Sequence, residues 1–427
     1  MPKITTKLHR SAATRAMALA LLMLTACGQA PEQAQTIVVY EGARLIAGDG
    51  SAPIENSVFA VDNGRFVAVG EASEVSVPAG ATRVDLTGMT VMPAIVDAHT
   101  HMSTTREALI DDLQRRAYFG VGAAVSMGSD GPDTPLELRD EIIPDAARFR
   151  SAGHGITGPE PGRRVVHWVT TEAEARQAVR DEAARNVDLI KIWVDDRDGQ
   201  YEQLSPAIYG AVIDEAHQNG LRVAAHIFDL EDGKGLLRAG VDIFAHGVRD
   251  RDIDDEFVAL VRERPNVVLI PNLPNRGVAA DLSWLAGSMP VEELEALQAG
   301  ATDQPQAQEA FGIQARNLAR LSNEGMTIAF GTDGNTPWAP HVEMEDMVAA
   351  GMTPAQVLVA ATRNAAALLD LSDMGTIEAG KSADFIVLEA NPLDDITNTR
   401  RIASVYLRGE KVDRAAISAR WSGMGAN

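Results

Sequence analysis

The chain has 427 residues, 45% hydrophobic and 23% charged, so it is long enough for a large barrel with a small second domain and too apolar to be disordered. Lysine and arginine number 38 against 60 aspartates and glutamates, which gives a formal net charge of −22. Such a charge repels phosphate backbones, so we expect no nucleic-acid partner. The single cysteine excludes an internal disulfide and a cysteine-based zinc finger.

The N-terminus has the pattern of an export signal. Residues 1–26 carry basic but no acidic side chains, and their apolar run at 16–24 is shorter than the ~20 residues that span a bilayer. Cys27 directly follows Leu-Thr-Ala, which resembles a bacterial lipoprotein signal whose cysteine is lipidated. The alternative is a buried helix with an incidental cysteine. We expect a tether over 27–36, a lipid anchor as the only membrane contact, and a periplasm-facing lipoprotein of the bacterial cell envelope or a secreted protein.

Both ends of the remaining chain predict β structure. Residues 37–91 and 375–412 contain short apolar runs with turn signals between them. The strongest turn signal is Asn63-Gly64, which predicts a β-hairpin. Because neither segment is large enough to fold alone, we expect the two to form one small domain. Residues 413–427 are expected to be a C-terminal tail.

Residues 92–374 alternate apolar runs with amphipathic stretches, a pattern typical of β/α units. The expected strands are Ala94–Ala98, Gly122–Ser126, Gly153–Thr157, Leu189–Trp193, Arg222–Ala225, Ile243–Ala245, Val267–Pro271 and Ile328–Gly331. Helices are expected at Thr171–Arg185 and Pro206–Gln218. Eight such units predict an α/β fold of the (β/α)₈ TIM-barrel type. The alternative is an open doubly wound sheet, but no glycine-rich dinucleotide fingerprint follows any strand.

Metal-binding side chains stand where these strands end. His99 and His101 close the first strand, His226 the fifth and His246 the sixth, and Asp333 follows the eighth. Because side chains alternate along a strand, the first two histidines face the same side and can chelate one ion. Barrel enzymes carry their chemistry at this end of the strands. Imidazole and carboxylate ligands suit zinc, manganese or iron.

Lys191 is an unusual member of this set, because apolar residues flank it at 189–190 and 192–193. We expect it to be buried, where an unpaired ammonium is costly. A desolvated neutral amine reacts with CO₂ to give a carbamate, an anionic group that can bridge two metal ions. The alternatives are a surface lysine or an ion pair with Asp195 or Asp196.

Several segments resemble motifs of the amidohydrolase superfamily. Residues 91–101 (VMPAIVDAHTH) closely resemble its first-strand motif, although Ala94 stands where glycine is usual. Residues 350–354 (AGMTP), 361–366 (ATRNAA) and 375–384 (GTIEAGKSAD) resemble its C-terminal motifs. The resemblance runs from about residue 37 to 412. It implies a (β/α)₈ barrel with a β-sandwich domain formed from both termini.

The resemblance also implies a binuclear centre with two divalent metal ions, of which zinc is expected. The implied ligands are His99, His101, Lys191, His226, His246 and Asp333, with Lys191 as N6-carboxylysine bridging the ions. By position, His99, His101 and Asp333 hold the more buried ion. A hydroxide between the metals is then the nucleophile, and Asp333 passes its proton to the leaving group.

The lysine, and the lack of a glutamate shortly after His226, argue against a deaminase. Met102-Ser103, where dihydroorotases usually have an arginine, argues against that branch. The prolidase-like and imidazolonepropionase-like members are most similar, which implies cleavage of an amide in an Xaa-Pro or other dipeptide or an N-acyl amino acid. Residues 193–201 lack the usual Gly-Gly turn, so the substrate can differ. The alternatives are a lactone or phosphotriester hydrolase on the same site and a non-catalytic lipid-anchored binding protein.

A small-molecule substrate requires side chains around the metals, and loops after the strands supply candidates. We expect His154, Tyr201 and Arg249 to contact substrate, although each has an ordinary structural role as its alternative. Arginine can clamp a carboxylate with two parallel hydrogen bonds. His341, after the eighth strand, is expected at the mouth of the barrel. We also expect a homo-oligomer.

Overall fold

The structure is a computed structural model that describes residues 37–163 and 165–422. The expected signal peptide, tether and Cys27 therefore lie outside the described residues. None of the described helices combines the length and the apolar character needed to cross a bilayer.

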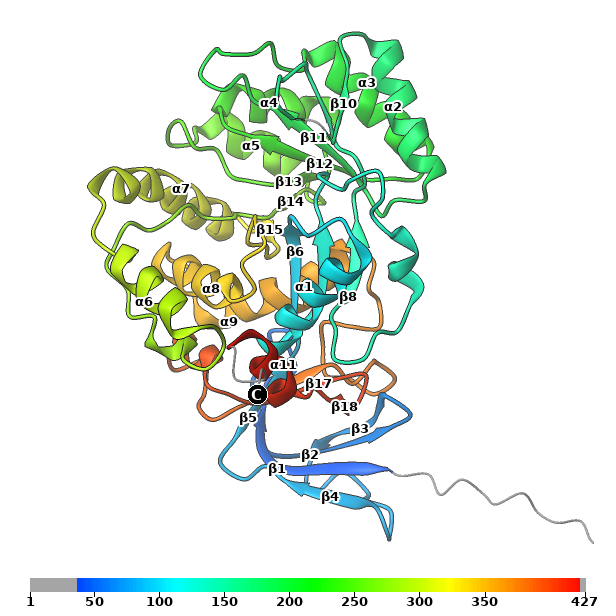
Figure 1. The fold of residues 1–427 in the computed structure, drawn as a ribbon, viewed down its shortest axis with the longest axis vertical. Coiled ribbons are helices and arrows are strands. Elements are labelled where there is room, and N and C mark those ends of the chain that lie inside the picture. Colours follow the sequence, from blue (N-terminus) through cyan, green and yellow to red (C-terminus); the bar gives the residue numbers. More distant parts are fainter. Residues whose placement is uncertain (1–36, 164, 423–427) are drawn as a thin grey trace, which may run out of the picture. The chain divides into compact units, whose positions relative to one another are not determined.

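The small β domain joins the two ends of the described chain in one eight-stranded sheet (Figure 1). Its strands are β1 (Val38–Leu45), β2 (Ile54–Asp62), β3 (Arg65–Glu71), β4 (Thr82–Asp85), β5 (Thr90–Pro93), β16 (Phe385–Leu388), β17 (Ile402–Leu407) and β18 (Glu410–Lys411). The order is β18-β17-β16-β5-β1-β2-β3, and β4 pairs with β1. The antiparallel pairing of β5 with β16 thus connects segments about 300 positions apart.

Turn chemistry and aromatic packing explain this domain. Asn63 and Gly64 both have positive φ, 48° and 75°, and they join β2 to β3 as the sequence predicts. The ring of Tyr40 stacks on Phe59 with centroids 4.8 Å apart and meets the edge of Phe385 at 5.2 Å. Aromatic side chains from both ends of the chain therefore share one core.

The middle of the chain forms the (β/α)₈ barrel that the sequence predicts, and the open-sheet alternative is wrong. Its eight strand positions are taken by β6 (Ile95–Thr100), β7 (Val121–Ser126), β8 (Arg148–Ser151) together with β9 (Ile156–Thr157), β11 (Ile190–Val194), β12 (Val223–Ile227), β13 (Ile243–Phe244), β14 (Val268–Leu269) and β15 (Thr327–Ile328). β8 and β9 share the third position, since β8 pairs with β7 and β9 pairs with β11. The short β10 (His167–Trp168) pairs with β9. Backbone hydrogen bonds from Ala98 to Phe330 (2.9 Å) and from Asp333 to His99 (2.8 Å) connect the eighth strand to the first.

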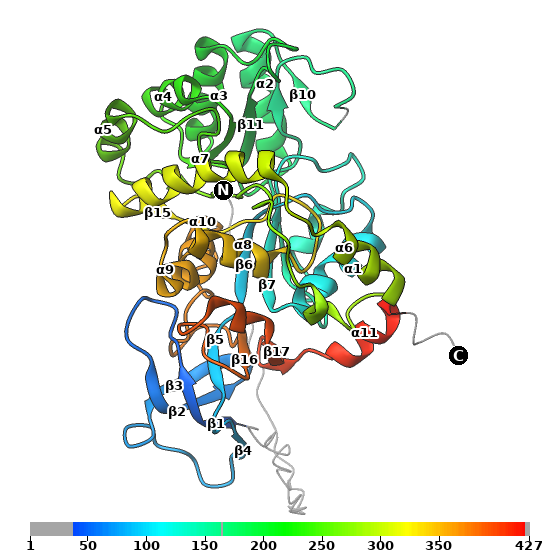
Figure 2. The same cartoon turned by 90° about the vertical axis from the view of Figure 1, so that its left-hand side faces the viewer.

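Helices separate the barrel strands and surround them (Figures 1 and 2). They are α1 (Arg106–Tyr118), α2 (Glu172–Ala184), α3 (Pro206–Gln218), α4 (Leu230–Ala239), α5 (Asp255–Glu263), α6 (Val291–Gly300), α7 (Pro305–Asn323), α8 (Ala339–Ala349), α9 (Pro354–Val359) and α10 (Ala365–Leu368). A capping box between Thr171 and Glu174 begins α2. The expected C-terminal tail contains α11 (Arg414–Trp421), whose Trp421 donates to Asp111 on α1.

Two expectations about the barrel need correction. The third strand begins earlier than expected, at β8, and within the expected range of 153–157 it contains only the two-residue β9, which pairs with β11. Arg148 and Arg150 interrupt the apolar pattern by which a buried strand is recognised, so β8 could not be identified from the sequence. Both arginines are accommodated in the fold because each pairs with a carboxylate beside the strand. His341 does not line the mouth of the barrel: it lies in α8, is 1% exposed, and contacts the Phe119 carbonyl and the Thr399 hydroxyl.

Candidate active site

Three histidines meet one carboxylate at the ends of the barrel strands, and a fourth histidine stands beside them. The Oδ1 atom of Asp333 lies 3.0 Å from Nε2 of His101 and 3.4 Å from Nε2 of His99. Its Oδ2 atom lies 3.3 Å from Nε2 of His246, whose ring centroid is 4.6 Å from that of His226. The structure therefore brings together side chains from β6, β12, the end of β13 and the loop after β15, which the sequence predicts to be ligands.

Backbone geometry sets the position of the carboxylate. Asp333 has a φ of 52°, in the left-handed region, so the chain turns sharply as it leaves the eighth strand. Two residues earlier, a Cβ on Gly331 would lie 2.7 Å from the Cβ of His99. Glycine is therefore required for the eighth strand to approach the first histidine this closely.

Lys191 projects from β11 and is 0% exposed, and its Nζ atom has no hydrogen-bond partner among the described residues. Burial lowers its pKa to about 7. The surface and ion-pair alternatives are both wrong, because Asp195 pairs with Arg197 and His226 instead. A buried amine without a partner, beside a carboxylate and imidazoles, fits a group that becomes an anionic metal ligand.

The imidazoles are also in a state suited to metal binding. Burial and neighbouring positive charges lower the pKa values of His99 and His246 well below the usual range, so both rings are neutral with a free lone pair. The side-chain nitrogen of Asn272 lies 2.7 Å from Nδ1 of His99 and fixes that ring. His99, His101 and Asp333 have ligand atoms within 4.8 Å of one another. The donor set therefore fits a divalent metal centre.

A second cluster lies around Glu182 on α2, which is 1% exposed. Its Oε1 atom is 2.8 Å from Nε2 of His167 and 3.6 Å from Nδ1 of His154. Its Oε2 atom accepts hydrogen bonds from the backbone N–H of His154 (3.0 Å) and from Arg185 (2.7 Å). His154, predicted to touch substrate, is thus positioned by Glu182, and neither Glu182 nor His167 was part of the site predicted from the sequence.

A polar cleft of about 640 Å³ lies beside His226, lined by the loops after β11, β12 and β13. We name it the Arg249 cleft, after the arginine that lines it together with Tyr201, Asp195 and several other acidic residues. Asp195 Oδ2 lies 3.0 Å from Nε2 of His226, so the cleft adjoins the histidine cluster. Two predicted substrate residues, Tyr201 and Arg249, are therefore in one cavity.

Arg249 has unused hydrogen-bond donors inside this cleft. Its Nε and Nη2 atoms are buried and lack partners among the described residues. Burial lowers its pKa to about 10, so it still carries a positive charge at neutral pH. The other arginines after these strand ends each pair with a carboxylate: Arg197, Arg251 and Arg276. Among the described residues, Arg249 has two buried donors without a partner and no carboxylate paired with it, whereas Arg276 has one such donor, its Nε, and is paired with Glu345.

A cluster of histidines, aspartate and buried lysine at the C-terminal ends of barrel strands defines a class of barrel hydrolases. The sequence profile of the Amidohydrolase family matches residues 90–412, and the chain belongs to this family. It is therefore an enzyme, a hydrolase acting on C–N bonds, and the family is generally metal-dependent.

Several known proteins are similar to this chain over most of its length. An imidazolonepropionase from Deinococcus radiodurans is 28% identical over 363 residues, which cover 78% of this chain and 86% of the relative. An ochratoxinase from Aspergillus niger is 25% identical over 425 residues, covering 86% and 83%. A crystal structure from Bifidobacterium longum, provisionally named a prolidase, is 30% identical with a TM-score of 0.74, covering 91% and 99%. The chain is similar to proteins with different names, so these likenesses leave the substrate open.

Proposed function

We propose that the protein cleaves an amide bond in a small substrate that carries a carboxylate, such as an Xaa-Pro or other dipeptide or an N-acyl amino acid. The observation that carries this proposal is Arg249, a half-buried cation in a cleft beside the metal-ligand cluster, whose buried Nε and Nη2 donors have no partner among the described residues. A guanidinium suits a carboxylate because two N–H groups can bind its two oxygens. Most other charged groups in the cleft are acidic and would repel an anion, so the arginine also sets its orientation.

We further propose that the site holds two divalent metal ions, and we expect zinc because imidazole and carboxylate donors suit it. His99, His101, His226, His246, Asp333 and carboxylated Lys191 would hold them. When bound, the ions polarise the amide carbonyl and lower the pKa of a water toward 7, so that it attacks at neutral pH. The oxygen of that water would bond to the carbonyl carbon, and Asp333 would accept the proton that the water loses. Asp333 would then deliver this proton to the nitrogen as the C–N bond breaks, which leaves a carboxylic acid and a neutral amine.

The environment of Lys191 supports its proposed carboxylation. The lone pair of the neutral Nζ attacks the carbon of CO₂, an N–C bond forms, and one C=O electron pair moves to oxygen. The nitrogen then loses a proton to solvent, which leaves a carbamate with one negative charge. The reaction needs the neutral amine, and a pKa of about 7 makes that form abundant at neutral pH.

The cellular context that we propose rests on the sequence before residue 37. Basic residues, a short apolar run and Leu-Thr-Ala-Cys27 support a lipid-anchored envelope protein facing the periplasm. The substrate would then be a molecule that reaches this compartment. We also propose a homo-oligomer.

The test is hydrolysis by the chain produced with zinc and bicarbonate. The panel contains Xaa-Pro and other dipeptides, N-acyl amino acids, an aryl lactone and a phosphotriester. We expect amine release from a carboxylate-bearing amide, and its loss in Asp333→Asn. Activity on the lactone or phosphotriester alone would overturn the amide proposal and retain the metal site.

A further inference from the structure

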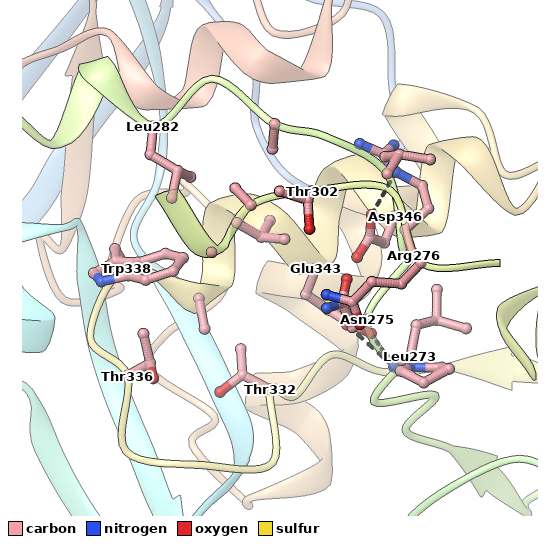
Figure 3. Close-up of a pocket in the computed structure, with 18 residues that line it drawn as sticks. Leu273, Asn275, Arg276, Leu282, Thr302, Thr332, Thr336, Trp338, Glu343 and Asp346 are labelled. Atoms are coloured by element: carbon pink, nitrogen blue, oxygen red, sulfur yellow. Dashed lines mark hydrogen bonds and ion pairs between the residues drawn. The ribbon is translucent and has the colours of Figure 1, made fainter. Parts of the chain in front are cut away.

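A second cavity, of about 310 Å³, is formed by the chain after β14, the connection between α6 and α7, and α8. We name it the Trp338 pocket; its lining includes Leu273, Arg276, Leu282, Thr332, Trp338 and Asp346 (Figure 3). It shares no lining residue with the Arg249 cleft. The barrel therefore has two separate cavities on different loops.

The two cavities adjoin different residues of the metal-ligand cluster. In the Trp338 pocket, Leu273 follows Asn272, which contacts His99, and Thr332 directly precedes Asp333. The Arg249 cleft begins instead at Asp195, beside the ring of His226. A substrate with its scissile amide at the cluster therefore has one cavity available for each half.

The size and walls of the Trp338 pocket suit an aromatic group. An engineered cavity of about 150 Å³ binds benzene, so a cavity of about 310 Å³ has room for one or two rings. Leu273, Leu282 and Val342 supply apolar surface, and the indole of Trp338 offers a flat face or edge. In Figure 3, Trp338 stands on one side of the cavity, and Asp346 and Arg276 stand on the other.

The far side of the pocket carries an unused acceptor. Asp346 on α8 is 4% exposed, and its Oδ1 atom has no hydrogen-bond partner among the described residues. The nearest cation, Nε of Arg276, is 3.4 Å away without hydrogen-bond geometry, because the guanidinium is directed at Glu345 (2.6 Å). A buried acceptor left without a donor costs about 1–3 kcal/mol, which a ligand O–H or N–H removes.

We propose that the Trp338 pocket binds the acyl half of the substrate, an aromatic group of one or two rings that ends in a hydrogen-bond donor for Asp346. This inference rests on the proposed function, in which Arg249 binds the carboxylate of the amino-acid half. The ring packs against Trp338, and its hydroxyl or ring N–H donates to Oδ1 of Asp346. The preferred substrate is then an amino acid acylated by a phenol- or indole-bearing acid.

Binding to the full chain tests the pocket independently of catalysis. The probes are p-cresol and toluene, which differ only in the hydroxyl, and binding is followed by tryptophan fluorescence and ligand-observed NMR. At pH 8, where Asp346 is ionised because its pKa is about 7, we expect p-cresol to bind about tenfold more tightly, the effect of one hydrogen bond to a charged acceptor. Equal binding of the two probes would overturn the inference.

Variants assign that preference to the pocket. Asp346→Leu removes the acceptor and should abolish the preference, whereas Asp346→Asn keeps one neutral oxygen and should retain part of it. Trp338→Ala should weaken both probes, and Trp421→Ala, on α11 outside the pocket, should change neither. If Asp346→Leu does not fold, an undiminished preference in Asp346→Asn overturns the inference.

Hydrolysis separates this inference from the proposed function. The substrates are alanine acylated with 4-hydroxyphenylacetate, indole-3-acetate, phenylacetate or acetate. We expect kcat/KM to be highest for the first two, and the advantage of the hydroxyl to fall in Asp346→Leu. Turnover without that order would overturn the pocket inference and leave the proposed function standing. A p-cresol preference without turnover of any amide would instead overturn the proposed function and leave the ligand preference of the pocket standing.

Discussion

The carboxylate of Asp97 accepts two hydrogen bonds from Thr332, one from its backbone N–H at 3.1 Å and one from its hydroxyl at 2.8 Å. Asp97 lies on β6 two residues before His99, and Thr332 directly precedes Asp333. The contact therefore fixes the loop that carries Asp333 to the strand that carries His99. The buried guanidinium of Arg116, 3.3 Å away, balances the charge of Asp97.

Replacing Asp97 with alanine should both destabilise the protein and weaken metal retention. Arg116 would stay buried without its counter-ion, which costs about 3–5 kcal/mol in free energy of unfolding. The loop of Asp333 would also lose its two hydrogen bonds. Urea denaturation and metal analysis after dialysis measure the two effects. Glu137→Ala, which removes an exposed carboxylate 3.9 Å from Arg106, should change stability by about 0.5 kcal/mol or less. Unchanged metal content in Asp97→Ala would disprove the positioning role.

Two buried lysines should differ in their reaction with CO₂. The Nζ atom of Lys191 has no hydrogen-bond partner within residues 37–163 and 165–422, whereas the Nζ atom of Lys234 lies within 3.0 Å of Glu231, Asp254 and Glu256. These three carboxylates raise the pKa of Lys234, so it stays an ammonium and cannot attack CO₂. Protein loaded with ¹³C-bicarbonate should give one carbamate signal by ¹³C NMR. Lys191→Met should remove the signal and Lys234→Arg should keep it; persistence in Lys191→Met would refute the assignment.

Arg249→Met should impair substrates that carry a carboxylate. Losing hydrogen bonds to a charged group costs about 1.5–3 kcal/mol, so kcat/KM should fall by roughly 10- to 150-fold. The methyl ester of the same substrate should be affected far less, because it has no charge to lose. Arg251→Met is the matched control, since Arg251 is 67% exposed and pairs with Asp250. An equal loss for acid and ester would show that Arg249 does not bind the carboxylate.

Local patterns predicted much of the site. His99 and His101 are visible because a strand places alternate residues on one side, and the other ligands follow recognisable strand ends. Asn272 gave no such signal: it is a loop residue 173 positions from His99, and their contact depends on closure of the barrel and on its own φ of 43°. Glu182 was equally hidden, because a helical glutamate ordinarily faces solvent.

The third strand and the pockets show a second reason for failure. Strand periodicity presumes apolar inward residues, and Arg148 and Arg150 break that pattern because their partners come from distant segments. Asp346 likewise has the sequence context of a surface helix, since only the fold places it against a cavity. Residues whose environment is assembled from several loops therefore could not be predicted from neighbours in the sequence.

The stability of the protein should depend on pH through Asp346. Burial raises its pKa from 3.8 to about 7, while the unfolded chain ionises at 3.8. The folded state therefore binds more protons between these values, and stability falls as pH rises from about 4 to 7 and then levels off. Glu343, Glu345, Arg276 and Arg400 are its ionisable neighbours. Because an Asp346→Asn variant keeps all four, a comparison with that variant isolates the effect of Asp346.

Asp346→Asn cannot ionise, so it should be free of this penalty. Its stability relative to the parent should be smallest near pH 4, grow up to about pH 7 and stay constant above that value, with a span on the order of 4 kcal/mol. Urea denaturation at several pH values with constant metal measures the difference. If Asp346 were instead held as an anion by Arg276, the parent would gain relative to the variant as pH rises. The sign of the slope thus decides whether the pocket presents a strained acceptor or a satisfied ion pair.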